Sequence, residues 1–312
     1  MSTLEKYISK FSHLHVDRSK GALAPHKPIL LLAIIAEIEV GNIDANRIYI
    51  TPELMARFKD YWYQLVDNPK FTSNFSLPFY HLRTEGFWFL HNRLGKELIL
   101  TSSNSIKSFG QLKDVVDFAS FDDCLFGYLN SRLSREILRD TLLEAYFSGN
   151  RISDKNGIVV EISRQILNDS SIRYKTRAES FDDEQVFIRG GVFKKEIPRI
   201  YNYTCCISGM RIIVGDSVQM IDACHIIPFS ESNDDTICNG ISLCPNLHRA
   251  FDRHLITIDE NYRVVLRPFN EDFTNYSIKQ FEGKEILLPK NVNHRPSQDN
   301  LNMHRSRFYT KH

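Results

Sequence analysis

Four polar residues in the second half of the chain have the chemistry and the spacing of a hydrolytic site. His225 closes a short apolar segment, Asn239 follows 14 positions later, and His248 stands 9 positions beyond that. Asp252 lies four positions after His248, so both side chains project from one face of a helix. An imidazole and a carboxylate on one face supply half of the ligands of a divalent ion. A second imidazole beside them could take a proton from water.

Strands and a helix must position these side chains. Residues 218–227 alternate apolar and polar side chains and predict an extended strand, which Pro228 ends. After a polar loop and a second, short strand, Asn246 is a suitable N-cap for a helix that begins at Leu247. We therefore expect the first histidine on a strand and the second on a helix that faces it.

The strings around these residues resemble those of the HNH (ββα-metal) nuclease superfamily. They are similar to the subset found in bacterial restriction endonucleases: Asp-Ala-Cys-His-Ile-Ile-Pro at 222–228, Asn-Gly-Ile-Ser-Leu at 239–243 and Leu-His-Arg-Ala-Phe-Asp at 247–252. The resemblance covers about 60 residues. It implies that His225 is the general base, that Asn239 steadies the loop holding the base, and that His248 binds a catalytic metal ion.

The ligand set of that metal ion has an open position. Many members of the superfamily have Asp or His directly before the base, where this chain has Cys224. Asp252, Asp222 on the strand face of Cys224, Cys224 itself or water could complete the set. We expect Asp222 and Asp252 beside His248, because a hard ion prefers oxygen ligands to a thiolate. The expected ion is Mg²⁺, with Mn²⁺ as the alternative.

The expected helix also carries two arginines that suit a phosphodiester substrate. Arg249 and Arg253 flank the ligand residues and could hold neighbouring phosphates. Hydrolysis needs an activated water, which a neutral His225 can deprotonate. It also needs charge neutralisation on the phosphate and on the leaving oxygen, which a divalent ion can supply.

The six cysteines argue against a structural zinc site. Many relatives brace the fold with two Cys-x-x-Cys pairs, and the corresponding strings here read Cys206-Ile-Ser-Gly209 and Cys244-Pro-Asn-Leu247. Each lacks its second cysteine, so we expect no structural zinc and interpret these thiols as small core residues. The first 20 residues are too polar for a signal peptide, which favours reduced thiols and a cytoplasmic location.

The first half of the chain predicts a separate, mixed domain. The apolar run 29–36 predicts a buried helix, and Thr51 is a suitable N-cap for a second one. Residues 78–90 predict a β-hairpin that turns at 85–86, and residues 137–147 predict a closing helix.

Two strings in this half resemble the sulfur-binding domain of phosphorothioate-dependent restriction endonucleases. They are His-Lys-Pro-Ile-Leu-Leu-Leu at 26–32, and Pro-Phe-Tyr-His-Leu at 78–82 followed by Gly-Phe-Trp at 86–88. Relatives often have an aromatic residue where this chain has Leu77. The resemblance implies these sulfur- and DNA-binding residues: Leu77 and Pro78 around the sulfur, with His26, Lys27, His81 and Arg83 on the DNA backbone or bases. The alternative is that the segment is a buried hairpin and His26 only starts a helix.

Length and composition fit a two-domain globular protein. The chain has 312 residues, a formal net charge of +1 and 42% hydrophobic residues, which excludes fibrous, collagen-like and disordered classes. Its longest apolar run is too short for a membrane span. We expect an α+β protein with a DNA-recognition domain over 1–150, a linker region over 151–190 and an HNH domain over 191–312.

Together these patterns predict a modification-dependent, type IV-like restriction endonuclease. Its expected partner is double-stranded DNA that carries phosphorothioate, and we expect a homodimer because two strands must be cut. One alternative is an HNH endonuclease that reads methylcytosine or a short sequence. Another is a protein that binds modified DNA without cleaving it.

Overall fold

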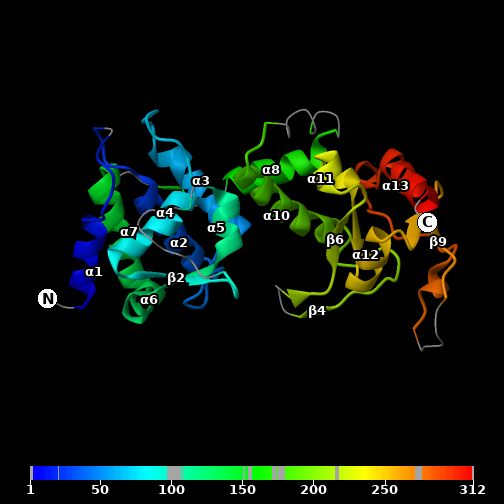
Figure 1. Ribbon diagram of the computed structural model, residues 1–312, viewed down its shortest axis with the longest axis horizontal. Coiled ribbons are helices and arrows are strands. Elements are labelled where there is room, and N and C mark those ends of the chain that lie inside the picture. The colour runs from blue at the N-terminus through cyan, green and yellow to red at the C-terminus, as the bar shows by residue number, and fades with distance from the viewer. Residues whose placement is uncertain are drawn as a thin grey trace. The chain divides into compact units, whose positions relative to one another are not determined.

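The chain folds into two compact units in the computed structural model, which describes residues 3–19, 21–96, 106, 108–149, 152–153, 157–170, 174, 180–214, 218–270 and 276–310 (Figure 1). Unit 1 is Met1–Val160 with Asp183–Ile188, and unit 2 is Glu161–Asp182 with Arg189–His312. Both contain helices and short antiparallel strands, which confirms the predicted α+β class. The exact domain boundaries near 150 and 190 stay a prediction. Among the described helices, none is long and apolar enough to cross a membrane.

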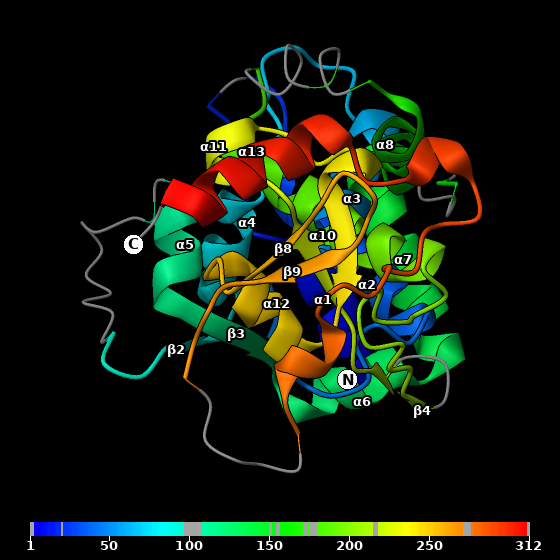
Figure 2. The same cartoon turned by 90° about the vertical axis from the view of Figure 1, so that its right-hand side faces the viewer.

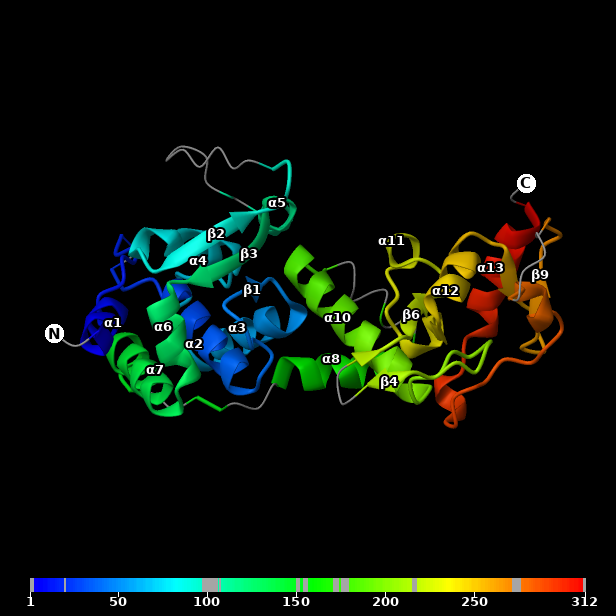
Figure 3. The same cartoon turned by 90° about the horizontal axis from the view of Figure 1, so that it is seen from below.

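Unit 1 consists of helices and a three-stranded antiparallel sheet. Its elements are α1 (Thr3–Ser12), α2 (His26–Glu39), β1 (Ile48–Tyr49), α3 (Pro52–Leu65), α4 (Ser76–His81), the 3-10 turn η1 (Leu82–Glu85), β2 (Trp88–Asn92), α5 (Phe109–Val115), β3 (Val116–Phe121), α6 (Asp123–Asn130) and α7 (Arg132–Phe147). The sheet order is β1-β3-β2, and β2 and β3 lie side by side in Figure 3.

Helix α2 forms the centre of unit 1. Each residue of the run 29–36 is at most 4% exposed, and α3, α4, α6 and α7 pack around the helix. A helix that is covered on all sides needs apolar residues on every face, which this run supplies. The start of α3 is also as predicted, because the Thr51 hydroxyl accepts the backbone N–H of Leu54 at 3.2 Å.

The predicted β-hairpin over 78–90 is wrong. The chain forms α4 and η1 here and then reverses at Gly86, whose φ of 70° is left-handed, before β2 begins. Phe75 and Phe79 are four positions apart, both fully buried, with ring centroids 5.5 Å apart, and this is a helical spacing. Trp88 Nε1 donates to the Phe79 carbonyl oxygen at 2.9 Å, which ties the helix to the strand. The aromatic residues therefore favour a helix over a strand.

Unit 2 contains the remaining elements. They are α8 (Gly157–Asn168), α10 (Asp183–Ile200), β4 (Ile213–Val214), β5 (Val218–Gln219), β6 (Asp222–His225), α11 (Phe229–Ser232), η2 (Ile237–Asn239), β7 (Gly240–Leu243), α12 (Pro245–Asp252), β8 (Ile256–Ile258), β9 (Val264–Leu266), η3 (Ile278–Phe281), η4 (Val292–His294) and α13 (Gln298–Thr310). The first residues of α8 and α10 belong to unit 1.

A ββα arrangement lies within unit 2. Strands β6 and β7 pair antiparallel, with Asp222 opposite Leu243 and His225 opposite Gly240. Helix α12 follows β7 after a single residue, and β8 follows α12 in the sequence. Helix α13, red in Figure 2, packs against β8. The predicted order of strand, loop, strand and helix is therefore present.

Two local details of this arrangement differ from the prediction. Helix α12 begins at Pro245 with Cys244 at the N-cap position, so Asn246 lies inside the first turn. The Asn246 amide instead donates to the Tyr276 hydroxyl at 2.9 Å. The polar loop after Pro228 begins with the short helix α11. Proline at the first helical position needs no backbone donor, which explains the earlier start of α12.

Candidate active site

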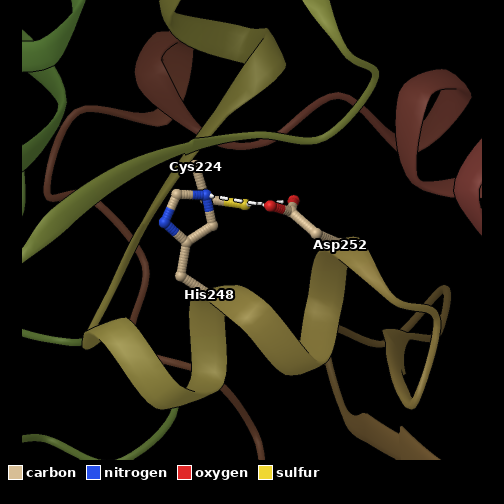
Figure 4. Close-up of side chains that lie close together, drawn as sticks. All are labelled: Cys224, His248 and Asp252. Atoms are coloured by element: carbon tan, nitrogen blue, oxygen red, sulfur yellow. Dashed lines mark hydrogen bonds and ion pairs between the residues drawn. The ribbon is translucent and has the colours of Figure 1, made fainter. Parts of the chain in front are cut away.

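Cys224, His248 and Asp252 bring three metal-binding side chains together. Cys224 comes from β6, and the other two stand one turn apart on α12. One possible ligand atom of each lies within 4.8 Å of the others, and Figure 4 shows the three side chains pointing toward one another. As predicted, His248 and Asp252 share a helix face, with Nε2 and Oδ2 3.4 Å apart. A thiol, an imidazole and a carboxylate form a donor set that suits a divalent ion.

Asp222 lies at the other nitrogen of the His248 ring. Its Oδ2 is 3.2 Å from His248 Nδ1, whereas Asp252 is beside Nε2. A histidine that binds metal through one nitrogen usually donates its other N–H to a carboxylate or carbonyl, which fixes the orientation of the ring. In this geometry Asp222 holds the His248 ring at Nδ1, and Nε2 faces the carboxylate of Asp252.

Cys224 is buried and contacts Asp252. Its Sγ lies 3.8 Å from Asp252 Oδ1 and 3.5 Å from the carbonyl oxygen of His225. Burial raises the pKa of the Cys224 thiol well above its usual range, and the Asp252 charge raises it further. The thiol is therefore protonated at neutral pH unless a cation replaces the proton.

His225 is held by a carboxylate that sequence analysis missed. Its Nε2 is 2.8 Å from Asp235 Oδ1, and the Asp235 side chain is only 2% exposed. The ring stacks on Phe193 of α10, with centroids 3.9 Å apart and planes 5° from parallel. An Nε2–H donated to a carboxylate leaves Nδ1 with its lone pair, which is the form that a general base requires. The acidic pair at 234–235 was the only sequence signal.

Asn239 connects the two ends of the loop that follows His225. Its Oδ1 accepts the backbone N–H of Ile227 at 3.0 Å, and its Nδ2 donates to the carbonyl oxygens of Ile227 and Asp234, each at 2.9 Å. Asn300 of α13 donates to the same Oδ1 at 3.2 Å. The side chain is fully buried, so these hydrogen bonds fix the loop without competition from water.

Helix α10 packs so closely against the first residue of β7 that only glycine fits there. A Cβ at Gly240 would lie 2.2 Å from Ile197 Cδ1 and 2.9 Å from Phe193 Cζ. Gly240 is the strand partner of His225, so the same contact places the Phe193 ring against the imidazole. The Asn-Gly pair of the sequence string therefore has a steric reason in this fold.

Arg249 and Arg253 lie on the outer surface of α12. Both are exposed and are four positions apart, so their side chains project from the same side of the helix. Neither forms an ion pair or a side-chain hydrogen bond within the part of the chain that the structure describes. They are available to an anionic partner, and their predicted role on phosphates stays a prediction.

Cys205, Cys206 and Cys244 are buried, as expected for small core residues. Cys205, not Cys206, lies beside Cys244, and Ser208 contacts both thiols through its backbone N–H at 3.4 Å and its hydroxyl at 3.8 Å. The Cys244 thiol donates to Cys205 and lowers the pKa of Cys205. Serine and Leu247 occupy the positions where a zinc site of this spacing would need thiolates.

A cavity of about 490 Å³ in unit 1 collects most of the residues predicted to read modified DNA. Its lining includes His15, Val16, Asp17, Ala24, His26, Lys27, Phe71, Leu77, Pro78, His81 and Thr84. Arg83 is not in this lining, because its guanidinium lies 4.2 Å from the ring centroid of Tyr80. Residues 15–17 were missed by sequence analysis, since nothing in their local pattern indicates a cavity.

Lys27 is tied to protein acceptors inside this cavity. Its Nζ donates to the carbonyl oxygen of His15 at 2.7 Å, to the Thr84 hydroxyl at 3.0 Å and to Glu85 Oε1 at 2.5 Å. Burial acts to raise the pKa of Glu85, but hydrogen bonds from Lys27 and His15 outweigh it and lower that pKa. The lysine is therefore a cation whose charge is balanced within the fold.

Two of the three histidines of the cavity, His81 and His26, are held in different ways. The pKa of His81 is lowered by burial and by the nearby charges of Lys27 and Arg83, so the ring is neutral at pH 7. His26 opens α2, with its Nε2 2.9 Å from the carbonyl oxygen of Thr72. The cavity wall thus combines apolar side chains, neutral imidazole and a compensated lysine.

Comparison with known proteins supports the class that the second unit defines. Residues 205–259 match the family model described as HNH endonuclease. They are an HNH endonuclease domain, which belongs to a class of DNA-cleaving hydrolases that use divalent metal ions. The predicted ββα-metal domain is therefore confirmed.

Two solved structures resemble the chain more loosely. The modification-dependent TagI restriction endonuclease is 24% identical over 37% of this chain and 36% of its own, with a TM-score of 0.27. The chain thus spans about a third of the length of that enzyme. The type IV phosphorothioation-dependent restriction endonuclease ScoMcrA is 10% identical over 78% of this chain and 93% of its own, with a TM-score of 0.35. No curated protein matches the chain.

Proposed function

We propose that this protein is a modification-dependent restriction endonuclease in which unit 1 recognises phosphorothioated double-stranded DNA and the HNH domain cuts it. The observation that carries the proposal is the cluster of Cys224, His248 and Asp252, together with the carboxylate-held His225 that follows Cys224 on β6, inside a segment that matches the HNH endonuclease family. Because one such site cuts one strand, we propose that two copies act together as a homodimer.

Proton transfer is the task of His225. Asp235 accepts a hydrogen bond from Nε2–H, so Nδ1 can take a proton from the attacking water, and stacking on Phe193 keeps the ring from rotating. Asn239 fixes the loop on the C-terminal side of the base. Arg249 and Arg253 would bind phosphates on either side of the scissile bond.

Cys224, His248 and Asp252 would hold the divalent ion, and Asp222 would orient His248. When bound, the ion neutralises charge on the scissile phosphate and on the departing oxygen. A thiolate donor favours borderline ions such as Zn²⁺ or Co²⁺ over Mg²⁺, because Mg²⁺ binds oxygen ligands and keeps much of its water. We therefore propose a softer ion than the Mg²⁺ that the sequence predicts.

The donor set can be tested with cobalt, which reports thiolate ligation by absorption. Titration of the metal-free protein with Co²⁺ is expected to produce a sulfur-to-cobalt charge-transfer band in the near ultraviolet. Cys224→Ser should lose this band, whereas Cys238→Ser, a half-exposed cysteine outside the cluster, should keep it. An unchanged band in Cys224→Ser would contradict thiolate ligation, and Asp222→Asn is expected to weaken cobalt binding by about 10- to 100-fold.

The cavity of unit 1 has the chemistry of a site for sulfur on a phosphate. Sulfur in place of a non-bridging oxygen is larger, more polarizable and a poorer hydrogen-bond acceptor. Leu77, Pro78 and Phe71 can cover it at little desolvation cost, whereas a hydrated oxygen would lose hydrogen bonds to water. The neutral His81 and the compensated Lys27 keep strong donors away from the sulfur. Exposed basic residues elsewhere would supply affinity for the DNA backbone.

A comparison of binding to duplexes with different marks tests this proposal. Three duplexes of one sequence, carrying phosphorothioate, methylcytosine or no mark, are compared by gel shift at a fixed salt concentration. We expect the phosphorothioate duplex to bind most tightly, and Pro78→Ala to remove more of that preference than of the binding to plain DNA. Tightest binding of the methylcytosine duplex would favour the alternative, an HNH endonuclease that reads methylcytosine. Equal binding of all three duplexes would contradict recognition of a mark.

A further inference from the structure

A buried chain of hydrogen bonds runs from α10 to the catalytic base. Arg189 Nε donates to the Tyr174 hydroxyl at 2.7 Å, and the Tyr174 hydroxyl lies 3.3 Å from Asp235 Oδ2. The other oxygen of Asp235 is 2.8 Å from His225 Nε2. Arg189, Tyr174 and Asp235 are at most 4% exposed, so water does not compete for these bonds. Two of the four residues lie outside the segment that matches the HNH family.

The direction of each hydrogen bond in the chain is fixed by chemistry. A guanidinium can only donate, so the Tyr174 oxygen accepts from Arg189 and its proton points to Asp235. Burial and the Asp235 charge raise the pKa of Tyr174, which keeps the phenol protonated. An ionised carboxylate can only accept, so His225 must present Nε2–H to Asp235. The base therefore has its free lone pair on Nδ1.

The charges along this chain of hydrogen bonds are also balanced. A buried guanidinium needs a nearby anion. Among the described residues, however, the hydrogen-bond acceptors of Arg189 are neutral, namely the Tyr174 hydroxyl and Gln165 Oε1 at 3.0 Å. Asp235 supplies the anion on the far side of the phenol. Arg189 in turn lies over the Tyr174 ring, 4.7 Å from its centroid, which holds the phenol in place.

We propose that Tyr174 and Arg189 are positioning residues that select the tautomer of His225 through Asp235. The region predicted as a linker is then part of the catalytic unit, since Tyr174 comes from it and Arg189 lies on the helix whose Phe193 stacks on the base. This inference rests on the proposed function of His225 as the general base.

Removal of the Tyr174 hydroxyl tests the inference. In the full-length protein, Tyr174→Phe is expected to lower kcat for DNA cleavage by about 10- to 100-fold, with DNA affinity unchanged. The tautomer is read independently from the imidazole ¹⁵N chemical shifts of His225. The wild-type protein should show the Nε2–H form. In Tyr174→Phe, Asp235 loses the hydrogen bond that aims its carboxylate at Nε2, so a mixture of both tautomers should appear.

Tyr201→Phe is the matched control, because Tyr201 is a buried tyrosine of unit 2 whose hydroxyl has no hydrogen-bond partner among the residues that the structure describes. It should leave kcat and the His225 shifts unchanged. If Tyr174→Phe does not fold, Arg189→Lys replaces it, since an ammonium keeps the charge but not the planar donor fork. A wild-type Nδ1–H form, or variants with unaltered His225 shifts, would overturn the inference. A wild-type protein that cuts no DNA would contradict the proposed function alone, because the tautomer is measured without DNA.

Discussion

Replacement of His225 by alanine is expected to abolish DNA cleavage while DNA binding persists. General-base catalysis by a positioned imidazole contributes about 10²- to 10⁴-fold to a rate, and this site offers Nδ1 of His225 for that role. The side chain makes its contacts with Asp235 and Phe193, not with the exposed arginines of α12 that would hold phosphates. Loss of the ring should therefore reduce kcat and leave the dissociation constant of the DNA complex near its wild-type value.

Single-turnover cleavage of a labelled duplex and gel shift of the same duplex measure the two quantities. His294→Ala, which removes an imidazole from unit 2 outside the site, is the control and should cut normally. Circular dichroism establishes that His225→Ala is folded. Cleavage by the folded variant at the wild-type rate would exclude His225 as the base.

The core of the candidate site in unit 2 could be predicted because its geometry depends on local spacing. Four positions between His248 and Asp252 guarantee a shared helix face, and the structure places their side chains 3.4 Å apart. Pro228 marks the end of the apolar strand that carries His225. These features require only contacts along one element or between neighbouring elements, which periodicity encodes directly.

The partners of that core could not be predicted in the same way. Asp235 meets His225 through the fold of a loop, and Phe193 meets it from a helix more than thirty positions earlier in the sequence. Cys224 was an open alternative because its burial was unknown, and preference for oxygen ligands favoured Asp222. The structure puts Asp222 at Nδ1 of His248. Sequence spacing does not tell which nitrogen of the ring a carboxylate contacts.

Unit 1 shows a second reason for failure. The segment 78–90 is rich in aromatic residues, which strands and buried helices both accept, so composition did not separate them. Phe75 and Phe79 have the four-residue spacing of a helix. Phe75 lies before the string at 78–82 that resembles the sulfur-binding domain, so this string alone does not contain the helical spacing. The predicted set of His26, Lys27, Leu77, Pro78 and His81 still lines one cavity, because helices α2 and α4 pack together.

Breaking the Lys27–Glu85 pair is expected to cost more stability than any surface change in unit 1. The two side chains are 10% and 3% exposed with Nζ and Oε1 2.5 Å apart, so Glu85→Gln leaves a buried ammonium without its anion. Removal of one partner of a buried pair costs about 3–5 kcal/mol, whereas removal of both is often nearly neutral. Glu85→Gln should therefore lower the free energy of unfolding by that amount, and Lys27→Met with Glu85→Leu should recover most of it. Urea unfolding of the variants measures both.

The pH dependence of the same pair gives an independent check. The pKa of Glu85 is lowered in the folded protein, so its contribution to stability is present above the unfolded-state pKa and is lost as pH falls through the folded-state value. The stability gap between the wild-type protein and Glu85→Gln should thus narrow in acid, because the protonated carboxyl resembles the amide. Glu144→Gln, at an exposed position of α7, is the control and should show a small gap at every pH. A Glu85→Gln variant as stable as the wild type at pH 7 would mean that Lys27 is solvated in the cavity and free to contact a DNA phosphate, as the sequence predicts.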